Sequence, residues 1–539
     1  MADNYDDYSR EELLRELRLR DRRPRFGLVW ERKEIDHEKA VNDDFVMLDF
    51  DPALSCGVAP YRNLIIEGDN FDALRYLRMT HAGKIKCIYI DPPYNTGNRD
   101  FIYNDRFVDK DDAYRHSKWL EFMYRRLQLA RDLLAEDGVI FVSIDDGEAC
   151  HLKILMDSVF GSSNFIGQFV WKSRQNKDNR TKNGASIDHE YIFAYGTFLR
   201  GVERDHEQYK NPDSDPRGLW ASGNMVGLAD EKARPNLHYD LIDIETDINY
   251  GKPKQGWRFD RNRMASLMAD KRILWPAKLS GRPRVKVFLQ EMKSEFTGYS
   301  SIIGSQIFTY HGTRELEDIF ENRAFDFPKP SDLILELVRQ GAPNKDDIVL
   351  DFFAGSGTTA HAVMKLNTED GGNRRFILVS STEATDIEPD KNLCRDICAE
   401  RVRRVIQGYT NKKAEAVAGL GGNFAYLRTR RLPAETLFNC IQHEAIWTAL
   451  QLIHAESLSP FIADALIQQA VLENSTVVYL PNINERTLQC LHDACTTAAT
   501  LIVYTWQPGL LRQHFDDDRL SFLPIPQFLV DRFGIGSKA

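Results

Sequence analysis

The chain has 539 residues, of which 42% are hydrophobic and 28% are charged, and its formal net charge is −10. This usage excludes disordered and collagen-like classes, and the length predicts two to four domains with sizeable cores. The longest apolar runs are strand-sized and the first twenty residues lack an apolar core, so we expect neither a membrane span nor a secretion signal. The eight cysteines form no CxxC pair. We therefore expect a reduced, cytoplasmic protein without a metal site.

The charge is distributed unevenly along the chain. Gly251–Ser300 holds twelve Lys and Arg against four Asp and Glu, and Lys172–Lys182 adds five bases against one acid. From Leu432 to the end, five bases face eleven acids. A basic run is most often a solvated face, so this pattern indicates a nucleic-acid partner only if chemical motifs support it.

The first predicted elements are a helix that a capping-box pattern opens at Ser9–Glu12, continuing to about Arg20, and a strand at Phe26–Trp30. From Asn63 onward, short apolar segments alternate with helical ones. The predicted strands are Leu64–Ile66, Ile85–Ile90, Val139–Ile144, Val349–Asp351 and Phe376–Ser380, and the predicted helices are Phe71–Met79, Trp119–Ala135, Glu148–Phe160, Thr358–Leu366 and Asp396–Gln407. This alternation indicates an α/β fold with a doubly wound, mostly parallel sheet covered on both faces.

Changes in composition predict the domain boundaries. The alternation of predicted strands and helices stops between about Trp171 and Arg323, where the basic excess and many aromatic residues lie. We therefore expect an insertion between two halves of one sheet domain. After a glycine-rich joint, a small βαβ pattern indicates a separate C-terminal α/β unit that docks a protein or stabilises the catalytic domain. The predicted parts are an N-terminal segment 1–44, a catalytic half 45–172, an insertion 173–315, a cofactor half 316–418 and a C-terminal domain 419–539.

The first chemical motif is Asp91-Pro92-Pro93-Tyr94, directly after a predicted strand. Two prolines fix φ and remove two backbone donors, which leaves a carboxylate, the Pro92 carbonyl and an aromatic ring. Two acceptors and a stacking plane suit an exocyclic amino group on a flat base. A proline-rich turn that merely closes the strand is the alternative interpretation.

The second motif is the turn Phe353-Ala354-Gly355-Ser356-Gly357 between a predicted strand and a helix. Such a turn lets the backbone approach a nucleotide-like ligand and directs helix N–H groups at it. The turn lacks the third glycine of a dinucleotide fingerprint, and Thr358 is not the lysine of a phosphate loop, so NAD and ATP are disfavoured. Both motifs follow apolar strands, where open α/β sheets bind ligands.

Together these motifs resemble the β class of amino-group DNA methyltransferases, with the catalytic motif before the glycine motif. Further segments resemble the modification subunits of type III restriction systems over roughly residues 20–410. These segments are Phe26–Trp30, Ile66–Asn70, Asp91–Asp105, Arg115–Trp119, Ile144–Asp146 and Asp351–Thr359. The resemblance implies a Rossmann-like methyltransferase fold and S-adenosylmethionine as cofactor.

The resemblance also implies roles for individual residues. Asp91 and the Pro92 carbonyl, in a loop that includes Pro93, would hold the target amino group while Tyr94 stacks on the base. Asp188–Tyr191 resembles a motif that lines the target-base pocket, or forms only a surface turn. The residues that the resemblance places around the cofactor are Asp69, Asn70, Lys329, Asp351, Phe353, Ala354, Gly355, Ser356, Gly357, Thr358 and Glu383. Among these, Asp69 would reach the adenine edge, Lys329 would close over the cofactor carboxylate, and Glu383 would bind the ribose.

We therefore expect site-specific methylation of adenine N6 in double-stranded DNA, with the base rotated out of the helix and the basic insertion reading the sequence. The implied partners are DNA, a second copy of the chain and a restriction or other defence subunit. No membrane is expected as a partner, and the protein is expected near the nucleoid. Cytosine-N4 methylation, RNA or protein substrates and a binding-only specificity subunit remain alternatives. A nuclease is disfavoured, because Glu291–Lys293 lacks the upstream aspartate that would complete its motif.

Overall fold

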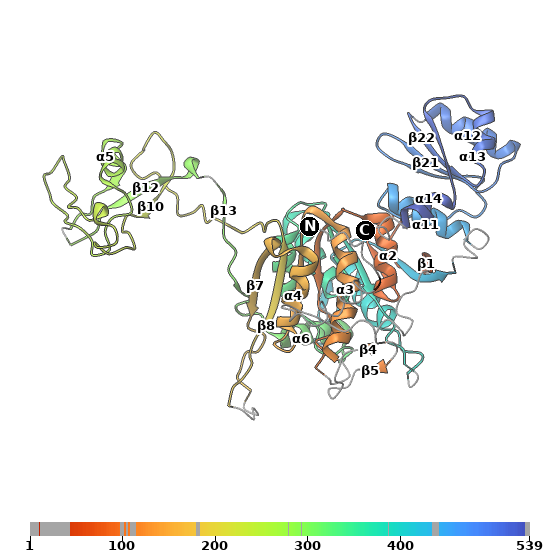
Figure 1. The fold of residues 1–539 in the computed structure, drawn as a ribbon, viewed down its shortest axis with the longest axis horizontal. Helices are drawn as coiled ribbons and strands as arrows, with labels where there is room; N and C mark the ends of the chain where they lie inside the picture. Colours follow the sequence, from red (N-terminus) through yellow and green to blue (C-terminus); the bar gives the residue numbers. More distant parts are fainter. Residues whose placement is uncertain are drawn as a thin grey trace. The chain divides into compact units, whose positions relative to one another are not determined.

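A computed structural model describes the following residues: 10, 44–96, 102–103, 106–107, 115–178, 184–278, 280–292, 294–385, 388–433, 441–497 and 499–533. The helix expected from Ser9 to Arg20 and the strand expected at Phe26–Trp30 therefore lie outside the described residues. The chain divides into two compact units, one within residues 1–200 and 300–539 and the other Gly201–Tyr299. Each unit is described by itself (Figure 1).

A mostly parallel sheet of ten described strands forms the centre of the larger unit (Figure 1). In spatial order the strands are β1 (Phe45–Cys56), β19 (Phe424–Leu432), β2 (Leu64–Glu67), β16 (Arg375–Ser380), β15 (Ile348–Asp351), β3 (Ile85–Ile90), β6 (Leu134–Ile144), β8 (Glu190–Gly196), β7 (Phe165–Trp171) and β14 (Ile302–Ile303). The strands from β19 to β6 are parallel to one another, whereas β1 and β8 run antiparallel to their neighbours. This confirms the α/β class.

Helices cover both faces of this sheet. One face packs against α2 (Asn70–His81), α3 (Arg115–Leu133) and α4 (Ala149–Phe160), and the other against α7 (Ser331–Gly341), α8 (Thr358–Asp370) and α9 (Glu400–Gln407). Strand β3 is buried along its whole length. Ile88 and Ile90 join the core formed with α2 to α4, while Cys87 lies against Gly341 of α7. Because alternate residues of a strand point to opposite faces, this strand needs apolar side chains on both.

The catalytic sheet extends further along the chain than the expected boundary at residue 419. Strand β19 inserts between β1 and β2, so the sheet ends only at Leu432. The apolar half Phe424–Leu427 is buried, whereas the following arginines pair with acids. Arg428 lies 2.6 Å from Asp51 and Arg430 lies 2.6 Å from Asp49. Because this half of the strand is charged, a search for continuous apolar runs does not detect the strand.

The C-terminal part confirms the expected βαβ pattern and packs on the catalytic part. Its sheet has the order β20 (Gln468–Val471), β21 (Thr476–Leu480), β22 (Leu501–Thr505) and β23 (Leu520–Pro524), with β21 and β22 parallel around α12 (Glu485–Thr497). Three further helices are α11 (His443–His454), α13 (Pro508–His514) and α14 (Gln527–Phe533). Trp447 and Leu529 belong to the same core as Leu74 of α2, and Arg532 donates to the Met79 carbonyl at 3.1 Å.

The smaller unit is shorter than the expected insertion 173–315. Residues on either side of it pack with the catalytic sheet, because β8 pairs with β6 and β14 pairs with β7. Helix α6 (Thr309–Phe320) also belongs to the larger unit, and its Thr309 donates to the Ser173 carbonyl at 2.9 Å. The part of the insertion that forms a compact unit is Gly201–Tyr299.

This unit is built on a small antiparallel sheet with the order β10 (Trp220–Asn224), β12 (Arg284–Phe288) and β11 (Ile273–Leu274). A second pair joins β9 (Val202–Glu203) to β13 (Phe296–Thr297), and α5 spans Arg261–Ala269. The apolar core consists of Met225, Tyr239, Leu241, Trp257, Met264, Leu267, Ile273 and Val285. Tyr239 and Trp257, two of the aromatic residues of the predicted insertion, are therefore core residues.

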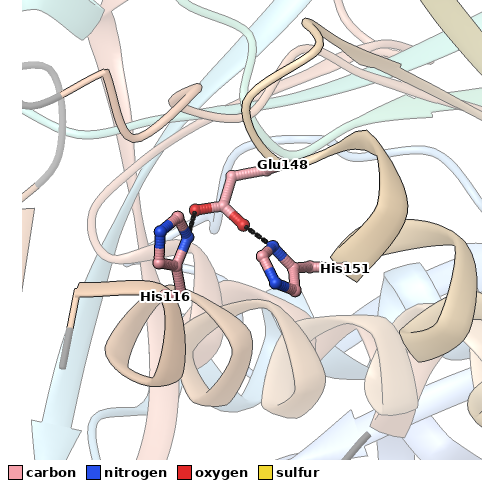
Figure 2. A group of neighbouring side chains, drawn as sticks. All are labelled: His116, Glu148 and His151. Atoms are coloured by element: carbon pink, nitrogen blue, oxygen red, sulfur yellow. Dashed lines mark hydrogen bonds and ion pairs between the residues drawn. The ribbon is translucent and has the colours of Figure 1, made fainter. Parts of the chain in front are cut away.

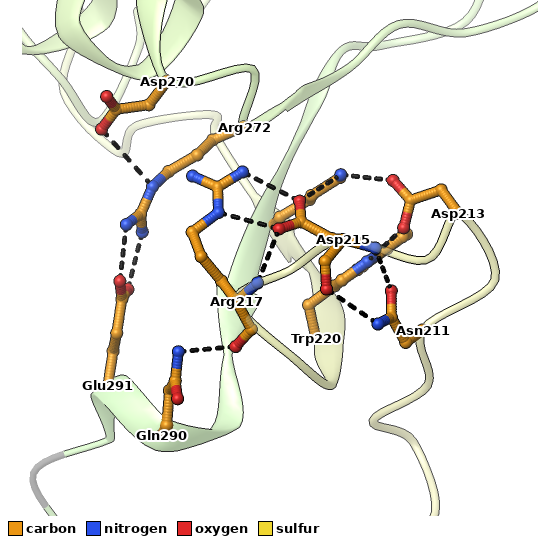
Figure 3. Close-up of polar contacts among 10 residues, drawn as sticks. Asn211, Asp213, Asp215, Arg217, Trp220, Asp270, Arg272, Gln290 and Glu291 are labelled. Carbon is orange, nitrogen blue, oxygen red and sulfur yellow. Dashed lines mark hydrogen bonds and ion pairs between the residues drawn. The ribbon is translucent and has the colours of Figure 1, made fainter.

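An ion-pair network covers the other face of this small sheet (Figure 3). The guanidinium groups of Arg217 and Arg272 lie 4.5 and 5.1 Å from the ring centroid of the fully buried Phe288. The basic side chains of the network are paired with acids: Arg217 with Asp215, Arg272 with Asp270 and Glu291, and Lys286 with Asp213 and Asp215. Part of the basic excess therefore stabilises the unit itself.

The remaining described elements are short. They are strands β4 (Ile102–Tyr103), β5 (Arg106–Phe107), β17 (Gly408–Thr410) and β18 (Ala416–Ala418), the single turns Ser162–Asn164, Pro235–Leu237 and Leu289–Glu291, and a π-helical segment Cys394–Ala399 before α9. Within the described ranges, we find no helix with the length and apolar composition needed to cross a membrane.

Candidate active site

Five parallel strands bring polar residues to one edge of the catalytic sheet. Strands β2, β16, β15, β3 and β6 are neighbours in this order, so their carboxyl ends lie side by side. The acidic residues at or after these ends are Asp69, Glu383, Asp351, Asp91 and Asp145. Because β15 and β3 pair directly, the glycine turn and the loop that begins at Asp91 are adjacent. Open α/β sheets bind ligands at this edge.

The Asp91 carboxylate is held by the ammonium group of Lys329. The Nζ atom lies 2.9 Å from Oδ1 and 2.8 Å from Oδ2 of Asp91, and it also donates to the Tyr94 hydroxyl at 2.8 Å. The same ammonium group lies 3.2 Å from Glu190 Oε2. From the sequence we expected Lys329 to contact the cofactor carboxylate. In the structure its ammonium group instead occupies the position expected for the target amino group.

Glu190 completes this cluster from the first position of β8. Its Oε2 accepts a hydrogen bond from the Tyr94 hydroxyl at 2.9 Å, and Lys329 is 10% exposed. Burial lowers the pKa of Lys329, but the charges of Asp91 and Glu190 outweigh burial and raise the pKa overall. Burial and the same two carboxylates raise the pKa of Tyr94 well above its ordinary value. Tyr94 is therefore a neutral phenol and Lys329 a cation at physiological pH.

Two contacts fix the loop that carries Asp91. Trp119 of α3 donates its indole N–H to the Pro93 carbonyl at 2.7 Å. Asn95 has a left-handed backbone (φ 58°), and its side-chain amide donates to Glu148 Oε1 at 2.6 Å. Asparagine tolerates this conformation better than most residues do. The loop is thus tied to the beginnings of both α3 and α4.

The glycine turn is organised by Asp351 at the end of β15. Asp351 accepts hydrogen bonds from the Phe353 N–H at 3.0 Å and from the Thr359 hydroxyl at 2.5 Å. Burial raises the pKa of Asp351 to about 7, although both hydrogen bonds act in the opposite direction. Gly355 and Gly357 both have a positive φ, at 49° and 77°. The turn therefore needs residues without a β-carbon at two positions.

Asp69 and Asn70 connect the glycine turn to α3. Asp69 caps α2 by accepting from the Phe71 N–H at 2.8 Å, and its other oxygen lies 3.2 Å from Arg126. Arg126 also donates to Asn70, whose amide donates to the Phe352 carbonyl at 2.9 Å. The Asp69 side chain is 47% exposed at the sheet edge. The Asp69 carboxylate is therefore accessible to solvent, although it already makes two contacts within the protein.

Four other residues that we expected to contact the cofactor make contacts elsewhere in the protein: Ser356, Thr358, Ala354 and Glu383. The hydroxyls of Ser356 and Thr358 accept from the buried Arg401 at 3.2 and 2.7 Å. Ala354 is buried, and its N–H donates to the Val379 carbonyl of β16. Glu383 is exposed and pairs with Lys391 at 3.0 Å. No described contact of Glu383 joins it to the cluster around Asp91.

Sequence reasoning missed one cluster beside the loop. Figure 2 shows the imidazoles of His116 and His151 turned toward the carboxylate of Glu148. Their Nδ1 atoms lie 2.5 Å from Oε1 and 2.8 Å from Oε2, respectively. The spacing of Glu148 and His151 at a helix start was visible in the sequence, but His116 precedes Glu148 by 32 positions.

The fold and this edge define an α/β protein in which the loop that begins at Asp91 lies beside a glycine turn. Comparisons with known proteins agree with this class. A family model described as DNA methylase matches residues 85–384, which is more than half of the chain. The protein therefore belongs to this DNA methylase family, which includes enzymes acting on adenine N6 and on cytosine N4.

Curated relatives include type III and type II enzymes. The Mod subunit of the type III restriction-modification enzyme StyLTI from Salmonella typhimurium is 36% identical over 379 residues, covering 64% of this chain and 57% of that protein. The EcoP15I Mod subunit from Escherichia coli is 31% identical and covers 64% and 63%. The type II methyltransferase M.KpnI from Klebsiella pneumoniae is 34% identical and covers 58% and 79%. This chain thus spans about six tenths of the two Mod subunits.

Solved structures match much more weakly. A putative DNA modification methylase from Thermus thermophilus is 14% identical and has a TM-score of 0.29, covering 62% of this chain and 96% of that one. The PvuII DNA methyltransferase, described as specific for cytosine N4, is 13% identical with a TM-score of 0.31, covering 64% and 93%. Likeness at this level supports no argument about the target base.

Proposed function

We propose that this protein transfers a methyl group from S-adenosylmethionine to adenine N6 in double-stranded DNA, as the modification subunit of a restriction-modification system. One observation carries the proposal. The carboxylate of Asp91 ends the strand β3 that pairs with β15, and β15 leads directly into the glycine turn. An amino-group acceptor and a cofactor cradle on adjacent strands would bring the two reacting groups together.

The residues at the sheet edge fit S-adenosylmethionine. The turn has two glycines with positive φ, and its Phe353 and Gly355 are partly exposed. Asp69 and Asp91 are 47% and 26% exposed on either side of the turn, so carboxylates face a ligand that carries positive charge. Phe353 would border the methionine part and Asp69 the adenine. Glu383 remains our candidate for the ribose hydroxyls.

Asp91, the Pro92 carbonyl and Tyr94 would carry out the chemistry on the base. The bound cofactor supplies a methyl group on a positively charged sulfur. Asp91 and the Pro92 carbonyl would accept the two N–H bonds of the adenine amino group, which localises the nitrogen lone pair. As the new N–C bond forms and the S–C bond breaks, Asp91 would hold the proton that nitrogen releases. Tyr94 would stack on the base.

Lys329 has to leave Asp91 before this step. An ammonium group has three donors, and here they reach Asp91, Tyr94 and Glu190. The target amino group would need the same acceptors. Movement of Lys329 toward a cofactor carboxylate would free them, which reconciles its position in this structure with the role suggested by the sequence.

Adenine rather than cytosine is favoured by the similarity to type III Mod subunits and by aspartate at position 91. The same similarity suggests a restriction subunit as partner and a second copy of the chain. Gly201–Tyr299 is our candidate for reading the DNA sequence, because it is a compact unit and carries exposed basic residues such as Lys254, Lys271 and Arg282.

The test measures labelled methyl transfer from S-adenosylmethionine to double-stranded DNA, single-stranded DNA, RNA and protein. We expect double-stranded DNA to be the preferred acceptor and Asp91→Ala to abolish transfer while cofactor affinity changes less than about threefold. The control Asp326→Ala changes an exposed carboxylate that pairs with Arg323 at 2.8 Å. Near-normal transfer by Asp91→Ala would refute the catalytic assignment, and a preference for RNA or protein would refute the substrate.

A further inference from the structure

We propose that His116, Glu148 and His151 form a binding site for a divalent transition-metal ion, beside the catalytic loop but outside the methyl-transfer machinery. The three side chains each offer one ligand atom, and these atoms all lie within 4.8 Å of one another. Two imidazoles and one carboxylate are a donor set that proteins use for Zn²⁺, with a fourth position left open.

The local structure directs the three side chains toward one point. Glu148 immediately precedes α4 and His151 lies in its first turn, so their spacing of three residues places both on one side of the helix. His116 is the second residue of α3, and its ring centroid lies 4.8 Å from that of His151. Figure 2 shows both rings directed at the carboxylate between them.

Burial of the carboxylate favours a cation here. The Glu148 side chain is 1% exposed, whereas His116 and His151 are 39% and 34% exposed. A buried carboxylate is costly unless positive charge or several hydrogen bonds compensate it. In this structure the two imidazoles and the amide of Asn95 make hydrogen bonds to the carboxylate. A divalent ion would supply charge, and the partly exposed rings leave it a path from solvent.

Asn95 also holds the carboxylate of Glu148. Its side chain is 3% exposed, and its amide donates to Glu148 Oε1 at 2.6 Å and to the Arg115 carbonyl at 3.3 Å. Carboxylates that bind metal ions are commonly oriented by such outer hydrogen bonds.

Only small movements would convert the hydrogen-bonded cluster into a metal site. Ligand atoms around a tetrahedral Zn²⁺ lie about 3.3 Å apart, given metal–ligand distances of about 2.0–2.1 Å. The present separations from Glu148 are 2.5 Å to His116 and 2.8 Å to His151. Each ring would thus retreat from Glu148 by less than about 1 Å. The ligand atoms, which now lie within 4.8 Å of one another, would converge toward the same spacing. Rotation of partly exposed side chains is sufficient for such a change.

Metal binding would move one hydrogen of His116. Arg115 donates from Nε to His116 Nε2 at 3.3 Å, so Nδ1 of His116 carries the hydrogen that faces Glu148. Binding of an ion at Nδ1 would shift this hydrogen to Nε2 and open the contact with Arg115.

The test uses the full-length, untagged protein after treatment with a chelator, with Co²⁺ as a spectroscopic probe and Zn²⁺ as competitor. We expect about one equivalent of Co²⁺ to give the visible spectrum of a four-coordinate site and Zn²⁺ to abolish it. His151→Ala should weaken binding at least about tenfold, since even outer contacts of metal sites are worth 10–100-fold. Glu148→Gln, which preserves the side-chain shape, should do the same.

The control is His492→Ala, which removes an exposed histidine on α12. Equal Co²⁺ affinity of His492→Ala and His151→Ala would overturn the proposal, as would failure of the wild-type protein to bind one equivalent. The cluster would then be a hydrogen-bonded support only. Because the readout is metal binding, the result does not depend on methyl transfer.

Discussion

Asp91, Tyr94, Glu190 and Lys329 act as one charged unit at the residue scale. A single ammonium group contacts two carboxylates and a phenol, so the position of each side chain depends on the others. Removing one partner of such a buried set leaves the remaining charges without compensation. The stability of this cluster is therefore open to a direct test.

We predict that Lys329→Met lowers the thermal midpoint by about 5 °C or more. The loss of one partner of a buried pair costs about 3–5 kcal/mol, and the lower end applies because Asp91 is 26% exposed. In Lys329→Met the carboxylates of Asp91 and Glu190 repel each other without the ammonium group between them. Glu190→Gln removes one of these two charges. In the Glu190→Gln background, Lys329→Met should therefore lower the midpoint by less than half as much. Equal decreases in both backgrounds would contradict the cluster.

The positions of individual residues were predictable where strand order alone determines them. Asp91 and the glycine turn each follow an apolar strand, and parallel pairing brings such positions together. The contact between Lys329 and Asp91 joins residues 238 positions apart, and no local pattern encodes it. Glu190 lies in a motif that suggested the base pocket, but its hydrogen bond to Tyr94 emerges only from the folded structure.

At the scale of elements, the glycine turn has two positions with different constraints. A β-carbon at Gly357 would lie 3.1 Å from the Cys398 carbonyl and 3.2 Å from Cys398 Sγ, so these neighbours would have to shift, and the backbone has φ 77°. At Gly355 the nearest atom would be 3.4 Å away, on the ring of Phe325. Gly355 is therefore constrained more by its backbone and by the space a ligand would need than by its protein neighbours.

We predict that Gly355→Val reduces affinity for S-adenosylmethionine at least tenfold, measured by calorimetry. The branched side chain would occupy the cradle and would also strain a backbone with φ 49°. Gly371→Val is the matched control, because Gly371 has φ 64° and open space around it at the far end of α8. If both variants bind the cofactor equally well, the cradle lies elsewhere.

Five of the ten described strands of the central sheet were not predicted, namely β1, β7, β8, β14 and β19. For β1 and β19 the physical reason is clear. Strand β1 is continuously buried only over its first four residues, Phe45–Leu48, and β19 changes from apolar to basic at Arg428. Their charged halves pair across the sheet, Asp49 with Arg430 and Asp51 with Arg428. A search for continuous apolar runs detects strands buried on both faces but misses strands at a sheet margin that are stabilised by ion pairs.

At the scale of the whole molecule, the C-terminal part shares the core of the catalytic sheet. Glu456 pairs with Lys84 at 2.8 Å and with Arg375 at 2.7 Å, and Trp447 and Leu529 pack into the same cluster as α2. These contacts support the stabilising role that we considered beside docking. A truncation near Leu420 would also remove β19, so it would damage the catalytic sheet itself.

We predict that exchanging Gly201–Tyr299 for the corresponding unit of a relative changes the DNA sequence that is methylated without changing the methylated base. The unit has its own core and ion-pair network, so the exchange should preserve the fold of both parts. Sequencing of DNA methylated by the chimera would reveal the recognised site. Retention of the original site by a folded, active chimera would place recognition outside this unit.

The most direct test of the central claim is modification-sensitive sequencing of DNA from cells that express the wild-type protein or Asp91→Ala. We predict N6-methyladenine at one sequence motif with the wild-type protein and none with the variant, because the variant lacks the acceptor for the amino group. N4-methylcytosine in place of N6-methyladenine would contradict the proposed target base. Methylation that persists in Asp91→Ala would contradict the role of Asp91.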